Sequence, residues 1–296
     1  MTNQHQPLST HGAIPTDLAH LRGRIDAIDE AMHRLLMERG DIIDALIQTK
    51  KSHEAGSAFR PQREADMMRR LAERHHGSLP LEIVESLWRT IIGTFTWLQM
   101  PYNVHADTSL GIDVVRDIAR FHFGFSVPLY THALPDEVID SVAQSTGDLG
   151  IIRFEKQSTT PWWKALEADC SPKIIARLPF IERDKHAKRA HPVGEPAFVI
   201  SHPLGEGHAH DSTLLSVSFN NVIPEQELLY LNTVGFDIVT SVTSDGDAHT
   251  HCLIDADCRN TSIASTSELF KKTLKNVHSL KSVHIIGNHA ARLRVL

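Results

Sequence analysis

The chain has 296 residues, enough for two or three domains, and its composition is that of a globular protein. A formal net charge of −6 gives no electrostatic reason to expect a nucleic-acid partner. Three cysteines without CxxC spacing fit a reducing compartment. The N-terminus lacks the pattern of a secretory signal, and no apolar run approaches the length of a membrane span. We therefore expect a cytoplasmic protein with no membrane partner, beginning with a disordered tail over residues 1–14.

One long amphipathic helix is predicted from Asp17 to Lys51, with Thr16 as its N-cap. Apolar residues recur along it at helical spacing, at Leu21, Ile25, Ile28, Met32, Leu35, Leu36, Ile42, Ile43 and Leu46. A helix of this length extends beyond a small globule. Its apolar stripe is therefore expected to pack against other helices, including those of a second chain.

The basic residues of this helix fall into two sets. Arg39 and Lys50 are eleven residues apart and lie within about 20° of one another around the helix, so they can address one small anion. Arg22 lies about 100° away from Arg39 and roughly 25 Å along the axis. If Arg22 binds the same ligand, it serves a neighbouring subunit. The alternative is a solvated basic face.

Two shorter helices follow, READMMRRLAERHH and LEIVESLWRTIIGTFTWLQM, so residues 15–101 are predicted to form one all-α unit. The apolar positions of the third helix, Ile83, Leu87, Ile91, Ile92, Phe95 and Leu98, are expected to face a core. Folding the second helix back along the first would bring Arg63 and Glu64 towards Arg39 and Lys50, and the third helix carries Gln99 near its end. Such a set suits a small dicarboxylate with a hydroxyl group, because cations neutralise carboxylates and Glu64 can accept from the hydroxyl.

The composition changes after residue 101. Helical and strand patterns alternate over residues 105–202, which predicts an α/β domain. Residues 211–296 follow the order βαββαβ of a small ferredoxin-like module, and HPLGEGHAHDS reads as the linker before it. Trp162 and Trp163 are expected to pack in the core. The group His249, His251, Cys252 and Cys258 could hold zinc, but no HExxH or paired CxxC supports this, and we predict no metal and no cofactor.

Residues 18–100 closely resemble the all-α chorismate mutases, in which a long first helix intertwines with its partner in a dimer. The resemblance is carried by LRGRIDAIDE at 21–30, MERG and DIIDALIQTK within 37–50, RPQREADMMRRL at 60–71 and TIIGTFTWLQ at 90–99. The order of polar positions from Arg22 to Gln99 also agrees with the family. One position departs from it: Phe95 stands where the family often has serine, and Thr94 or Thr96 could substitute.

The resemblance implies a homodimer with shared active sites that converts chorismate to prephenate. Lys50 and Gln99 would contact the ether oxygen, while Arg39 and Arg22 from the partner chain would hold carboxylates. Glu64 and Arg63 would bind the hydroxyl region. This [3,3] rearrangement needs no nucleophile and no proton transfer, so catalysis rests on holding the reactive conformer and on stabilising charge as the ether bond breaks.

The remainder resembles a diverged form of the region that follows the mutase in bifunctional chorismate mutase–prephenate dehydratases. GDLGIIRFEKQS is similar to the ligand-binding stretch of the dehydratase. However, Glu195, Pro196, Ala197 and Phe198 stand where its Thr-Arg-Phe motif is expected. We therefore expect that dehydration has been lost. A bifunctional enzyme and a non-catalytic ligand sensor built on these domains are the alternatives.

Overall fold

The computed structural model describes residues 17–50, 59–183, 193–204, 211–233, 235–243, 249–259, 270, 272, 274 and 277–295. The chain divides into two units, Met1–Glu54 and Ala55–Leu296. No helix in the described part of the chain combines the length and hydropathy needed to cross a membrane.

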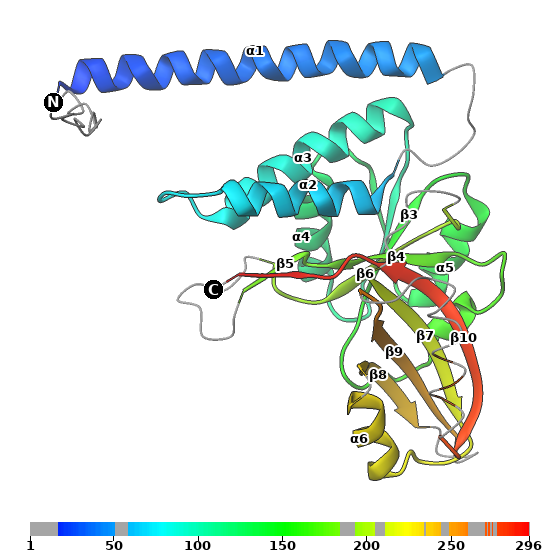
Figure 1. Cartoon of the computed structure of the whole chain (residues 1–296). Coiled ribbons are helices and arrows are strands. Elements are labelled where there is room, and N and C mark those ends of the chain that lie inside the picture. Colours follow the sequence, from blue (N-terminus) through cyan, green and yellow to red (C-terminus); the bar gives the residue numbers. More distant parts are fainter. Residues whose placement is uncertain are drawn as a thin grey trace, which may run out of the picture. The chain divides into compact units, whose positions relative to one another are not determined.

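The first unit contains helix α1 (Leu18–Lys50), which runs without a break over 33 residues, as the sequence predicts (Figure 1). The Asp17 side chain accepts a hydrogen bond from the backbone N–H of Ala19 at 3.1 Å, whereas Thr16, the predicted N-cap, lies outside the described residues. The apolar stripe is exposed in the single chain: Ile25 is 57% exposed and Ile42 is 62% exposed. Such a helix is incompletely packed on its own, because most helical stability in proteins comes from burying an amphipathic face.

The second unit begins with helices α2 (Pro61–Arg74) and α3 (Leu81–Gln99). Both confirm predicted helices. The sequence pattern placed the start of α2 at Arg63, but the helix includes Pro61, whose fixed φ angle suits the first turn of a helix. Its buried residues Ala65, Met68 and Leu71 pack with Leu81 of α3.

The prediction for the buried face of α3 was wrong in part, because Ile83, Leu87 and Leu98 are exposed. The buried side of the helix is largely polar and consists of Leu81, Glu82, Glu85, Arg89, Gly93 and Thr96. Ion pairs make this burial possible, and so does Gly93. A Cβ atom at Gly93 would lie 2.9 Å from the Phe123 carbonyl oxygen, so only glycine lets α3 approach the end of α4 (Ile112–Phe123) this closely.

A mixed sheet of nine strands, in the order β2-β1-β3-β6-β4-β10-β7-β9-β8, forms the centre of the second unit. Residues 104–201 contribute the strands β1 (Val104–Asp107), β2 (Leu129–His132), β3 (Leu149–Arg153), β4 (Lys173–Leu178) and β6 (Ala197–Ser201) to this sheet. Strands β1, β2 and β3 are parallel. Helix α4 covers one face of the sheet, and α5 (Pro135–Gln144) covers the other. The α/β character of this region is therefore confirmed.

The C-terminal half confirms the ferredoxin-like prediction. Its elements are β7 (Ser212–Phe219), α6 (Glu225–Thr233), β8 (Phe236–Thr243), β9 (Thr250–Asp257) and β10 (Leu280–His289). The four strands pair antiparallel in the order β10-β7-β9-β8. Residues 270, 272 and 274 are helical, while the rest of the predicted second helix lies outside the described residues, as does most of the hairpin turn SDGDAH.

The two predicted C-terminal modules share one sheet, because β10 pairs with β4 in parallel at Gly287 and Ile174. A Cβ atom at Gly287 would clash with the Ile174 carbonyl oxygen, so the close approach of the two strands requires glycine. Trp162 and Trp163 open a 3-10 helix, η1 (Trp162–Leu166), and both are buried in the core, as predicted. The predicted domain boundaries, at residues 101–105 and 202–211, stay predictions.

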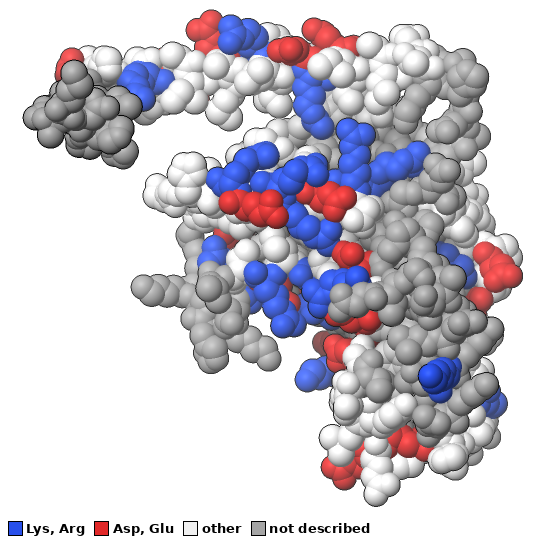
Figure 2. All heavy atoms as spheres, in the orientation of Figure 1, with Lys and Arg blue, Asp and Glu red and all other residues white. Residues whose placement is uncertain are grey.

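A small parallel sheet of β5 (Ile181–Arg183) and β11 (Leu293–Val295) holds α2 and α3 to the rest of the second unit. Phe180, Ile181 and Ala290 join the apolar cluster of α2 and α3. Arg183 binds Glu82 of α3 in a bidentate ion pair with distances of 2.7 and 2.6 Å. Figure 2 shows basic and acidic side chains gathered side by side over α2 and the neighbouring strands.

Candidate active site

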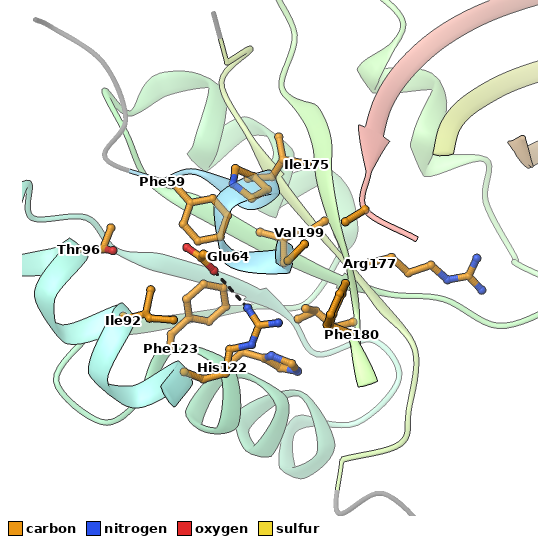
Figure 3. A pocket seen from close by; sticks show the side chains of 17 residues that line it. Phe59, Glu64, Ile92, Thr96, His122, Phe123, Ile175, Arg177, Phe180 and Val199 are labelled. Carbon is orange, nitrogen blue, oxygen red and sulfur yellow. Dashed lines mark hydrogen bonds and ion pairs between the residues drawn. The ribbon is translucent and has the colours of Figure 1, made fainter. Parts of the chain in front are cut away.

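Glu64, in the first turn of α2, forms an ion pair with Arg89 of α3 (Figure 3). The Arg89 Nη1 atom donates to the Glu64 Oε2 atom at 3.1 Å, and the two side chains are 9% and 12% exposed. Arg89 also lies 3.6 Å from the Glu85 carboxylate, one turn earlier on α3. The predicted hydroxyl-binding glutamate therefore has a cationic partner within its own unit.

The ion pair lines a cavity of about 40 Å³ between α2, α3 and the α/β domain. The cavity is largely apolar, with Phe59, Ile92, Phe123, Ile175, Phe180 and Val199 in its wall (Figure 3). The Arg89 guanidinium lies 5.9 Å from the centre of the Phe180 ring, which favours a cation–π contact. Arg177 also lines the cavity, but in Figure 3 its guanidinium points away from Glu64.

Burial raises the pKa of Glu64 from its ordinary value of 4.5 to about 7, although the positive charge of Arg89 acts in the opposite direction. The burial effect wins because the surrounding wall is aromatic and aliphatic and gives the carboxylate few hydrogen bonds. Carboxyl groups with a pKa near neutrality are often found at functional sites.

The other predicted residues of the second unit differ in their surroundings. Arg63 is exposed on α2. Gln99 is half-buried at the end of α3, and its Nε2 atom donates to the Phe95 carbonyl oxygen at 3.0 Å. Thr96, one of the two candidates to replace the family serine, lines the same cavity as Glu64. The structure thus brings Glu64 and Thr96 to one cavity, while Gln99 is turned back onto its own helix.

Arg22, Arg39 and Lys50 lie on α1 in the first unit. The unbroken helix preserves the predicted angular relation of their backbone positions, with Arg39 and Lys50 on one side. The Lys50 side chain lies outside the described residues. The convergence of these three cations with Glu64 and Gln99 stays a prediction.

Arg89 is the residue of this site that the sequence reasoning missed. A signal was present: Glu82, Glu85 and Arg89 follow one another at spacings of three and four in an otherwise apolar helix. The spacing places the three charges on one side of the helix, although the polar face of an amphipathic helix ordinarily lies toward solvent. Within the described part of the chain, no three metal-binding side chains gather in one place. His251 instead makes a hydrogen bond with Ser218, and Cys258 with the Ala256 carbonyl oxygen.

Comparison with known proteins places the helical segment in a family. Residues 21–100 match the chorismate mutase type II model. This segment is therefore a chorismate mutase type II domain, followed in the same chain by a mixed α/β domain.

The sequence relatives are longer proteins. The chain is 31% identical over 147 residues to the bifunctional chorismate mutase/prephenate dehydratase of Pseudomonas aeruginosa, a match that covers 48% of this chain and 40% of the relative. It is 32% identical over 114 residues to the protein of the same name from Neisseria gonorrhoeae, covering 38% of this chain and 30% of the relative. The match thus spans less than half the length of either relative.

Two solved structures were also found. The quorum-quenching acylase GqqA has 15% identity and a TM-score of 0.42, covering 64% of this chain and 94% of the other. The prephenate dehydratase of Arthrobacter aurescens, in complex with L-Phe, has 10% identity and a TM-score of 0.40, covering 64% and 90%.

Proposed function

We propose that the protein is a cytoplasmic chorismate mutase that converts chorismate to prephenate. The observation that carries the proposal is the match of residues 21–100 to the chorismate mutase type II family, with polar residues at the positions the reaction needs. Lys50 and Gln99 donate to the ether oxygen, Arg39 holds a carboxylate, and Glu64 accepts from the hydroxyl group. These groups stabilise charge that develops as the ether bond breaks.

The active form in this proposal is a homodimer in which Arg22 of one chain completes the site of its partner. The exposed apolar residues of α1, together with Ile83, Leu87 and Leu98 on α3, support it, because exposed apolar faces of this extent mark interaction surfaces. Arg63, exposed at the start of α2, contributes a further positive charge near the hydroxyl region of the substrate.

Substrate binding requires Glu64 to leave its present surroundings. A cavity of about 40 Å³ is far below the several hundred Å³ of ordinary ligand pockets. In this proposal the Glu64–Arg89 pair separates when chorismate binds, and Gln99 exchanges its bond to the Phe95 carbonyl for one to the substrate. Arg89 then keeps Glu85 as a partner, which limits the free energy that the separation requires.

Replacing Lys50 tests the catalytic assignment. Lys50→Ala should lower turnover of chorismate at least about 100-fold, the scale for losing one donor to the transition state. Lys51→Ala, at the neighbouring lysine, is the matched control and should retain turnover. If Lys50→Ala is as active as Lys51→Ala, Lys50 is not the donor and the proposed mechanism is wrong.

A second candidate function is a bifunctional enzyme that also dehydrates prephenate. It is favoured by the relatives, which are named as bifunctional chorismate mutase/prephenate dehydratases. Against it, the segment Glu195–Phe198 lacks threonine and arginine. Incubating the purified protein with prephenate and measuring phenylpyruvate decides between the two, because only the bifunctional enzyme forms phenylpyruvate faster than a blank without protein.

A further inference from the structure

The side of α2 and α3 that carries Glu64 packs against the α/β domain. Helix α3 places Ile92 and Thr96 beside Glu64 in the wall of the cavity. Much of the wall comes instead from the α/β domain, through the uncharged side chains of Phe123, Ile175, Phe180 and Val199 (Figure 3). Because the proposed function places the substrate hydroxyl at Glu64, these side chains stand where the substrate would need space and cationic groups.

An ion pair attaches α3 to this domain. Arg183 of β5 makes two hydrogen bonds with the Glu82 carboxylate, of 2.7 and 2.6 Å. The Glu82 side chain is 3% exposed and that of Arg183 is 20% exposed. Bidentate charged pairs of this kind are stronger than neutral hydrogen bonds. Removing the guanidinium would leave the Glu82 carboxylate buried without this cation, which disfavours the packed arrangement relative to one in which water reaches Glu82.

A second ion pair attaches α2. Arg69 binds the Asp211 carboxylate and donates to the Ala291 carbonyl oxygen at 3.3 Å, while Asp211 accepts from the Ala291 backbone N–H at 2.9 Å. Ala291 lies between β10 and β11, so Arg69 is connected to the strand that pairs with β5. The Arg69 guanidinium also lies 5.6 Å from the centre of the Phe180 ring, which belongs to the cavity wall. Both ion pairs thus hold the α/β domain beside Glu64.

These two ion pairs and the β5–β11 sheet form what we call the docking contact. Its apolar part is small: from the α/β domain, Phe180, Ile181 and Ala290 are the buried residues that join the cluster of α2 and α3. The ion pairs would be solvated after separation. Small, polar interfaces between parts of one chain commonly allow relative motion. The docking contact is therefore suited to separating and forming again.

We propose that the docking contact is autoinhibitory: while it is formed, the α/β domain blocks the mutase site at Glu64, and its separation opens the site to chorismate. This inference rests on the mutase function proposed above and adds its regulation. A substrate that binds only the separated state has an apparent affinity reduced by the fraction of protein in that state. Weakening the docking contact should therefore lower the KM for chorismate and leave kcat unchanged.

Steady-state kinetics of the full chain test this regulation. Arg183→Met and Arg69→Met each remove one ion pair and should each lower the KM at least about fivefold, the lower end of allosteric couplings, with an unchanged kcat. Arg116→Met, at an exposed arginine of α4 paired with Asp113, is the matched control and should keep the wild-type KM. A KM that is unchanged or raised in both variants would overturn the inference, because a merely structural contact gives no gain in affinity. A wild-type protein without turnover would instead overturn the proposed mutase function.

Alkylation of a cysteine placed at the cavity measures separation without using activity. Thr96 is 8% exposed, so Thr96→Cys in a Cys170→Ser background should react slowly with iodoacetamide. Adding Arg183→Met should raise the alkylation rate of this cysteine at least about fivefold, whereas adding Arg116→Met should leave it unchanged. Cys252, which is fully buried in the sheet, should stay unreacted and so shows that the protein remains folded. An equal rate with and without Arg183→Met would overturn the inference whether or not the protein turns over chorismate.

Discussion

Replacing Glu64 with glutamine should flatten the dependence of the free energy of unfolding on pH. In the folded chain the pKa of Glu64 is raised from 4.5 to about 7, chiefly by burial and against the influence of Arg89. The folded state therefore binds this proton more tightly than the unfolded state. The stability that the neutral carboxyl group contributes is fully present below about pH 4.5 and is lost as the pH rises through about 7.

The magnitude of this pH-dependent loss of stability follows from the pKa shift of Glu64. At about 1.36 kcal/mol per pKa unit, the wild-type protein should lose about 3 kcal/mol relative to Glu64→Gln between pH 4.5 and pH 8. Urea denaturation of both proteins across this range measures the difference. Glu73→Gln, at an exposed glutamate on the same helix, is the control and should run parallel to the wild type. If the Glu64→Gln curve also runs parallel to the wild type, the carboxyl group does not titrate in a buried site and the reasoning is refuted.

Three further predictions follow from the same structure. Mixing inactive Arg22→Ala subunits with inactive Lys50→Ala subunits should restore chorismate turnover, because one active site in each mixed dimer is intact. Mixtures that stay inactive after subunit exchange would exclude active sites shared between subunits. Neither phenylalanine nor tyrosine should change mutase activity more than about twofold, since an allosteric coupling of 1–3 kcal/mol would give at least about fivefold; a titration at sub-saturating chorismate that shows a clear inhibition curve would contradict this. Arg177→Met should lower the free energy of unfolding by about 3–5 kcal/mol in urea denaturation. The Arg177 Nη1 atom lies 2.7 Å from the buried carboxylate of Asp255, which the substitution would leave without its guanidinium partner. A loss below about 1 kcal/mol would show that the ion pair with His289 alone is enough to stabilise the Asp255 carboxylate.

Local patterns predicted the helices well. The spacing of apolar residues in α1 and the Pro135 that opens α5 are signals contained within one segment, and both helices formed where expected. The strand β1 was missed because VHAD is four residues long and carries two polar side chains. The ferredoxin-like order was readable because its strands are eight to ten residues long and each contains several β-branched or apolar residues.

At the candidate site, the partners of the charged side chains could not be predicted from the sequence. Arg89 was not predicted as a partner of Glu64, because the pair joins two helices and a helical pattern does not say which charges meet. The buried face of α3 was misassigned for a related reason: the helix has an apolar face and a polar face, and ion pairs with Arg183 and Glu64 make the polar one suitable for burial. The pairing of β10 with β4 is likewise non-local and depends on the close approach at Gly287.

The proposed function of this chain is the rearrangement of chorismate. The most direct test is the formation of prephenate from chorismate by the purified full chain, followed against the uncatalysed rate and in parallel with Lys50→Ala. We expect saturable turnover by the wild-type protein and at least about a 100-fold loss in the variant. Binding of chorismate by the wild-type protein without prephenate formation would contradict it and would indicate a ligand sensor built on a mutase domain.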